Sequence, residues 1–139
     1  MGRRRLGLAT ILLLVCAGCG DDGTTSDSPV GSYHATELTA TSSSGTTDLL
    51  AAGAELTMVL SSQGTTTGTL VIPAAFSESG NEETVSLAGN YDYDAATGVV
   101  TFTQSGDTFV RDMTWILTGD ELHGELTSAG TTIAATLQR

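Results

Sequence analysis

Apolar and polar side chains alternate along most of the chain between residues 30 and 139. A period of two predicts half-buried β-strands, and no helical apolar period runs there beyond one or two turns. Eight segments carry the strand pattern: residues 31–41, 55–62, 66–74, 84–93, 99–104, 108–118, 121–127 and 131–138. Short turns join almost all of them, many built on Gly, Asn or Asp, so the pattern predicts an antiparallel meander.

One connection is longer, at residues 42–53. Thr47 or Asp48 could cap a single helical turn that stops at Gly53. An irregular loop fits the same residues equally well.

An open meander leaves unpaired backbone groups on its first and last strands. Pairing the first strand with the last removes both edges and makes a barrel, whose interior is filled by side chains or holds one small ligand. A β-sandwich of immunoglobulin type needs crossing connections. We therefore predict an all-β domain, an eight-stranded up-and-down barrel in preference to a β-sandwich. Four small inward residues would leave space inside it: Gly68, Gly89, Gly124 and Ala135.

The first residues carry a different pattern. Arg3, Arg4 and Arg5 precede a twelve-residue apolar run at 6–17. A basic start, an apolar middle and small residues before a cut are typical of an export signal. Twelve residues of helix cover only about 18 Å, too little to cross a hydrocarbon core of about 30 Å.

Ala17-Gly18-Cys19 resembles the end of the lipobox of bacterial lipoproteins, with Cys16 where that family usually has Leu. Cys16 is a second candidate for modification, but Leu14 and Val15 before it are poor for cleavage. The resemblance implies a signal peptide at residues 1–18 that is removed, and acyl chains on Cys19 that anchor the protein stably to the membrane. We expect an exported protein attached to the bacterial cell envelope.

The domain organisation follows from this signal. Residues 19–29 would be the lipidated cysteine and a flexible acidic tether, and residues 30–139 the barrel domain. After cleavage, two arginines face sixteen carboxylates, a net charge of −14, and the chain has no lysine. This excludes the basic footprint of a nucleic-acid partner and an electrostatic grip on anionic lipid. Membrane contact would come from the lipid on Cys19 alone, and we expect a monomer.

No catalytic motif is present in the sequence. His34 and His123 are too few and too distant for zinc, which needs three or four ligands. Residues 90–94 match the start of a calcium loop, but Ala95 and Thr101 occupy the positions that need Gly and Glu. We expect no catalytic residue, no metal and no cofactor.

Arg111 is the most informative single residue. If the strand at 108–118 is unbroken, Arg111 points inward together with Phe109, Met113 and Trp115. A buried guanidinium must then pair with an internal carboxylate or with the acid group of a ligand. A bulge at Arg111 and Asp112 would instead turn the arginine to solvent.

The predicted barrel resembles the small lipocalin-like barrels of bacterial lipoproteins. Gly31-Ser32-Tyr33 stands where lipocalins carry Gly-x-Trp, the connection at 42–53 matches their lid loop, and Arg139 lies where an arginine packs over that aromatic ring. The resemblance implies a barrel with an apolar ligand.

Two hypotheses for function follow. In the first, the barrel binds a small apolar or carboxylate-bearing ligand without catalysis, near Arg111, Trp115, Tyr91 and Tyr33. In the second, a filled barrel acts as a structural or inhibitor-like interaction module through its loops.

Overall fold

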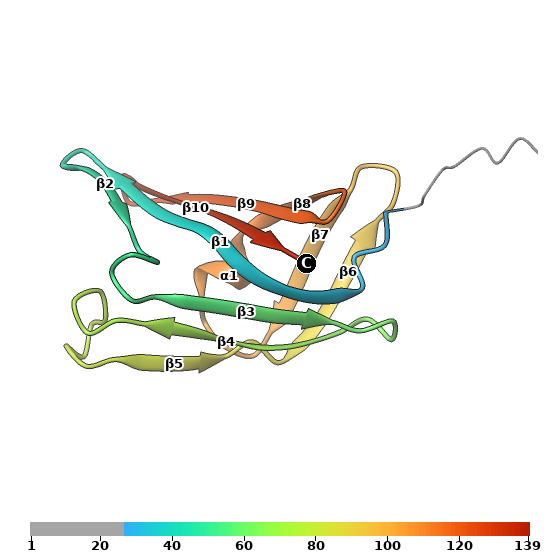
Figure 1. Cartoon of the computed structure of the whole chain (residues 1–139), viewed down its shortest axis with the longest axis horizontal. Coiled ribbons are helices and arrows are strands. Elements are labelled where there is room, and N and C mark those ends of the chain that lie inside the picture. Colours follow the sequence, from blue (N-terminus) through green and yellow to red (C-terminus); the bar gives the residue numbers. More distant parts are fainter. Residues whose placement is uncertain (1–26) are drawn as a thin grey trace, which may run out of the picture.

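The computed structural model describes residues 27–139. The predicted signal peptide, Cys19 and residues 20–26 of the predicted tether lie outside this part of the chain. The barrel strands are β1 (Gly31–Ser42), β3 (Glu55–Leu60), β4 (Thr65–Ile72), β6 (Gly89–Asp94), β7 (Val99–Gln104), β8 (Thr114–Thr118), β9 (Glu121–Ser128) and β10 (Thr131–Gln138) (Figure 1). Two short strands flank it, β2 (Gly45–Asp48) on β1 and β5 (Glu83–Ser86) on β4. Helix α1 (Phe109–Asp112) is a single turn, and within residues 27–139 no helix has the length and apolar character to span a membrane.

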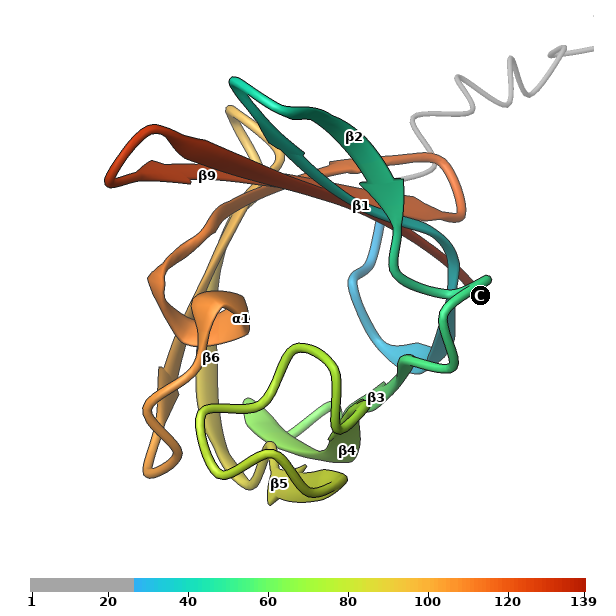
Figure 2. The same cartoon turned by 90° about the vertical axis from the view of Figure 1, so that its left-hand side faces the viewer.

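β1 closes the barrel because it has a partner on each side (Figure 2). Residues Gly31 to His34 pair with β3, and residues His34 to Thr41 pair with β10. The register of the β1–β10 ladder shifts between Ala35 and Glu37, which marks a bulge where the strand bends. The strand order runs from β10 through β9, β8, β7, β6, β4 and β3 to β1 and so returns to β10. The predicted eight-stranded antiparallel barrel is confirmed.

The predicted strand at 84–93 is two strands. Its pairing passes from β5 to β6 across Leu87 and Ala88. Leu87 is fully buried, its N–H donates to the Gly68 carbonyl at 3.0 Å, and its carbonyl accepts from the Thr66 hydroxyl at 2.7 Å. These bonds anchor Leu87 in the core, so β5 and β6 pair with different stretches of β4.

The predicted strand at 108–118 is wrong in its first half. Thr108 caps α1, and its side chain accepts the N–H of Arg111 at 3.4 Å. The Met113 N–H then bonds to the Phe109 carbonyl at 2.9 Å, which completes the turn before β8 begins. A threonine that caps its own backbone offers the chain an alternative to the strand, and here the helical turn is the outcome.

The connection at 42–53 combines a strand with a turn. Residues 45–48, which we did not predict as a strand, form β2. The Asp48 carboxylate then accepts the N–H of Ala51 at 3.0 Å, and Gly53 ends the turn with a φ of 101°. The single turn capped by Asp48, one of the two alternatives for this connection, is therefore correct for residues 48–53.

One end of the barrel, here called the closed end, is covered by residues 27–30, which include the last three residues of the predicted tether. The Tyr33 hydroxyl donates to the Pro29 carbonyl at 2.8 Å. The Arg139 guanidinium donates to the carbonyls of Ser28 at 2.7 Å and Val30 at 2.9 Å, and it forms an ion pair with Asp120. It also lies 5.9 Å from the centre of the Tyr33 ring, the arrangement that the lipocalin resemblance implies.

The interior of the barrel around Trp115 is filled. Trp115 is fully buried, donates from its indole nitrogen to the Val110 carbonyl at 2.9 Å, and meets the Phe102 ring edge-on at 6.1 Å. The inward glycines leave no free space. A Cβ on Gly89 would lie 2.2 Å from the Thr103 carbonyl oxygen, and a Cβ on Gly124 would lie 2.7 Å from the Trp115 ring. These glycines instead allow a neighbouring backbone or the Trp115 ring to approach closely.

We predict that Gly124→Ala lowers the free energy of unfolding by about 1–3 kcal/mol, the usual cost of overpacking a core. The reason is the contact of the new methyl group with the Trp115 ring. Urea denaturation measures the change. Combining Gly124→Ala with Trp115→Phe should cost less than the sum of the two single changes, because the smaller ring relieves the clash. Additive effects would contradict the proposed contact.

Candidate ligand-binding site

The four residues predicted to bind a ligand do not surround a common cavity. Tyr33 lies at the closed end, and so does Tyr91, whose hydroxyl donates to the Ser61 carbonyl at 2.6 Å. Trp115 is part of the packed interior. Arg111 lies on α1, outside the barrel core.

Arg111 does not point inward, because α1 replaces the strand that would have given it that phase. Its guanidinium donates to Asp107 at 2.6 Å and to Asp112 at 2.7 Å, both on the surface. The bonds from Arg111 lower the pKa of the Asp112 carboxyl, and the pKa of Arg111 is raised, chiefly by the Asp112 carboxylate. The alternative of a solvent-facing arginine is therefore correct, although a helical turn produces it and not a bulge.

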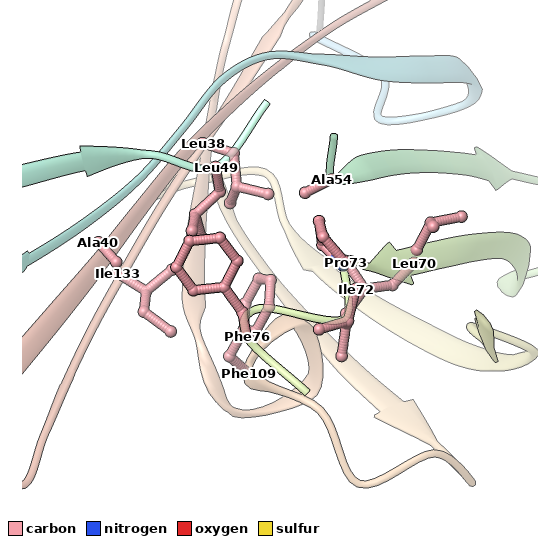
Figure 3. A pocket seen from close by; sticks show the side chains of 11 residues that line it. Leu38, Ala40, Leu49, Ala54, Leu70, Ile72, Pro73, Phe76, Phe109 and Ile133 are labelled. Carbon is pink, nitrogen blue, oxygen red and sulfur yellow. The ribbon is translucent and has the colours of Figure 1, made fainter. Parts of the chain in front are cut away.

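An apolar pocket lies at the opposite end of the barrel, here called the mouth, where β2, the turn after it, the loop after β4 and α1 come together (Figures 1 and 2). Its volume is about 250 Å³. Every lining residue is apolar: Leu38, Ala40, Leu49, Ala54, Leu70, Val71, Ile72, Pro73, Phe76, Phe109 and Ile133. In Figure 3 these side chains converge from several separate segments, and the Phe76 and Phe109 rings are seen between Ile133 and Ile72.

Local backbone bonds hold the walls of the pocket. The N–H of Leu49 donates to the Leu38 carbonyl at 2.8 Å, and the N–H of Ala54 donates to the Leu49 carbonyl at 2.9 Å. These bonds fix the turn after β2 against β1. The N–H of Phe76 donates to the Pro73 carbonyl at 2.9 Å, so the loop after β4 folds back on itself.

Phe76 is the exposed member of the pocket, with 45% of its surface accessible to solvent. Phe109 opposite it is half-buried and comes from α1. Apolar surface in water is unfavourable by roughly 25 cal/mol per Å², and this cost is removed when another apolar group covers the surface. The two rings therefore give an incoming apolar molecule a surface to cover.

The alternation of apolar and polar residues does not reveal this pocket, because much of its lining comes from segments without alternation. Leu49 follows β2, Pro73 and Phe76 stand in a polar loop, and Phe109 belongs to α1. One signal was visible: Leu49 and Leu50 interrupt an otherwise small and polar connection, and Phe76 does the same in the next. Apolar residues that gather into an exposed patch mark binding surfaces, whereas single exposed apolar residues are normal.

The titratable groups of residues 27–139 form no second site. His123 faces outward, 3.2 Å from a Glu121 oxygen and 3.2 Å from the Thr136 hydroxyl. Within residues 27–139 no three His, Cys, Asp or Glu side chains are placed to hold a metal ion together. The residues of the calcium-like stretch lie on β6, where Asp94 caps the following turn by accepting from the Ala96 N–H at 2.9 Å.

Comparison with protein-family models, with curated proteins and with solved structures finds no match for this chain.

We predict that the fold loses stability above about pH 10, the unfolded-state pKa of tyrosine. Burial raises the pKa of Tyr33, partly opposed by Arg139, and burial also raises the pKa of Tyr91. Above the unfolded pKa the folded chain keeps protons that the unfolded chain has lost, so this contribution is present below pH 10 and disappears as pH rises through the folded pKa values. Denaturant unfolding from pH 8 to 11.5 measures the slope.

The double variant Tyr33→Phe with Tyr91→Phe is the control for this experiment. It should be less stable at pH 8, because two hydrogen bonds to backbone carbonyls are lost. Its stability should nevertheless fall less steeply than that of the parent chain above pH 10. An equal slope would assign the alkaline effect to other groups.

Proposed function

We propose that this protein is a non-catalytic binding protein whose barrel takes up a small apolar ligand at the mouth. One observation supports this above all: the pocket is lined by apolar side chains alone, and it is partly open to solvent. Binding pockets are typically concave and mostly apolar, usually with a few polar groups that orient the ligand. A pocket without such groups suits a ligand recognised by burial of apolar surface.

The volume limits the size of the ligand. Pockets for drug-sized molecules begin at roughly 300 Å³, and an apolar cavity of about 150 Å³ takes up benzene. A pocket of about 250 Å³ lies between the two. A short alkyl chain or a single ring system fits this range, whereas a long acyl chain would have to extend out past Phe76.

The first nineteen residues of the sequence also support a cellular location for this activity. The basic start, the apolar run and the Ala17-Gly18-Cys19 ending support export and a lipid anchor on Cys19. In this proposal the lipid-anchored segment joins the barrel domain at its closed end. There the Asp27 carboxylate accepts from the Gly119 N–H at 3.4 Å.

A second function, an interaction module that acts through its loops, is favoured by the packing of the interior. Trp115, Leu122 and Leu137 are fully buried. A ligand deep in the barrel would have to displace them. The two proposals differ in what the mouth contacts: a small molecule in the pocket, or a protein that covers Phe76.

The first proposal is tested with 1-octanol, a small neutral apolar probe, titrated into the protein while amide NMR shifts are recorded. We predict saturable shifts at the residues that line the pocket. Ala40→Leu should weaken binding by about tenfold or more, because the added side chain fills part of the pocket. Ala134→Leu, the same change on the outer face of β10, should leave the affinity within about twofold.

Ala54→Val is a second, smaller filling change, useful if Ala40→Leu unfolds the barrel. Saturable binding that both filling variants weaken would support the pocket. Absence of binding, or equal binding by the Ala40→Leu and Ala134→Leu variants, would overturn the proposal and leave the loop interaction module.

A further inference from the structure

Carboxylates are concentrated in the segments that form the mouth. Residues 48–55, 73–83 and 107–112 together contain seven carboxylates and one basic side chain, a net charge of −6. These segments supply Leu49, Ala54, Pro73, Phe76 and Phe109 to the pocket wall. The apolar pocket therefore has an acidic surround.

Each of the three segments contributes. Asp48 and Glu55 border the turn after β2, and both are exposed. Glu78 and Glu82 are exposed in the loop that carries Phe76. Glu83 accepts from the hydroxyls of Ser77 and Ser79 at 2.6 and 2.5 Å, which lowers the pKa of its carboxyl, so this group stays ionised at neutral pH.

The single cation in these segments does not offset this charge for a ligand. Arg111 lies two residues from Phe109, but its guanidinium is bonded to both Asp107 and Asp112. Those three groups together carry a net charge of −1. Arg139, the other arginine of residues 27–139, lies at the closed end.

The negative charge of the mouth distinguishes between the two ligand classes that the sequence leaves open, an apolar molecule and a carboxylate-bearing one. An alkyl carboxylate with its chain in the pocket would place its head group among these acidic segments. Both guanidiniums of residues 27–139 are already paired with carboxylates. Charges within the Debye length of about 10 Å still interact at moderate salt, so like charges weaken binding and opposite charges strengthen it.

We infer that the mouth pocket selects the alkyl part of a positively charged amphiphile, an alkylamine or alkylammonium, over that of an alkanoate. The inference rests on the proposed function, because it names the ligand class of the same pocket. The apolar wall supplies the binding surface, and the acidic surround supplies the preference for a cation.

The test compares three probes with the same eight-carbon chain: octyltrimethylammonium, octyl glucoside and octanoate, each below its micelle concentration at pH 7.5. We predict that the cation binds about tenfold or more tightly than octanoate at about 20 mM salt, with the neutral glucoside between them. At about 0.5 M salt the ratio should fall toward twofold to threefold, because the shorter Debye length screens the surround.

Two double variants locate the effect. Glu78→Gln with Glu82→Gln removes two charges beside Phe76, and the cation-to-octanoate ratio should fall about threefold or more. Asp92→Asn with Glu121→Gln removes two charges from strands away from the mouth, and the ratio should change by less than half as much as in the first double variant. Arg111→Gln should raise the ratio, because it frees two carboxylates beside Phe109.

The outcomes separate this inference from the proposed function. Equal or tighter binding of octanoate, at a site that Ala40→Leu weakens, would overturn the cation preference and leave the apolar pocket intact. A preference that both double variants reduce equally would assign it to the overall charge of the protein and overturn the role of the mouth. Failure of all three probes to bind would overturn the proposed function itself.

Discussion

The pairing of β1 with two strands is the constraint on which the rest of the structure depends. The first residues of β1 pair with β3, and its later residues pair with β10, so one strand joins the beginning of the sheet to its end. Without the β10 ladder the meander would expose two edges and open its interior. The bulge between Ala35 and Glu37 lets the same strand bend from one partner to the other.

Closure divides the interior into two parts with different packing. Around Trp115 the side chains and the close approach of neighbouring backbones at Gly68 and Gly89 fill the space. At the mouth the turn after β2, the loop after β4 and α1 contribute apolar side chains but do not fill the space between them. The rigid part thus supports the walls of the pocket, and the less regular segments give it its lining and its charge.

The regular part of this architecture was predictable because alternation reports burial directly. Residues 55–60, 99–104 and 121–128 alternate in sequence and form strands with one buried face. The helical turn at 109–112 was not predictable from alternation, since Phe109, Arg111 and Met113 also fit a strand. The bonds from the Arg111 N–H to the Thr108 side chain and from the Met113 N–H to the Phe109 carbonyl distinguish the two, and local capping competes closely with strand pairing.

The candidate site shows the same limit more severely. Strand alternation predicted that Arg111, Trp115 and Tyr91 point into the barrel, and Tyr33 belongs to its lipocalin-like first strand. In the folded chain both tyrosine hydroxyls bind backbone carbonyls, the indole nitrogen does the same, and the guanidinium binds surface carboxylates. The pocket lies instead where loops converge. Closure of the barrel was predictable, but the loops that then meet at the mouth are set by their own conformations, which no alternation pattern encodes.

The position of the chain ends has a consequence for orientation. Residue 27 and Arg139 both lie at the closed end, joined through Asp120 and its neighbour Gly119, while the pocket opens at the other pole. A surface that holds this protein by its N-terminal side would therefore have the mouth turned away from it. The pocket would then take up molecules from the surrounding fluid or from a facing surface. Molecules in the surface that holds the protein would have the longest path to it.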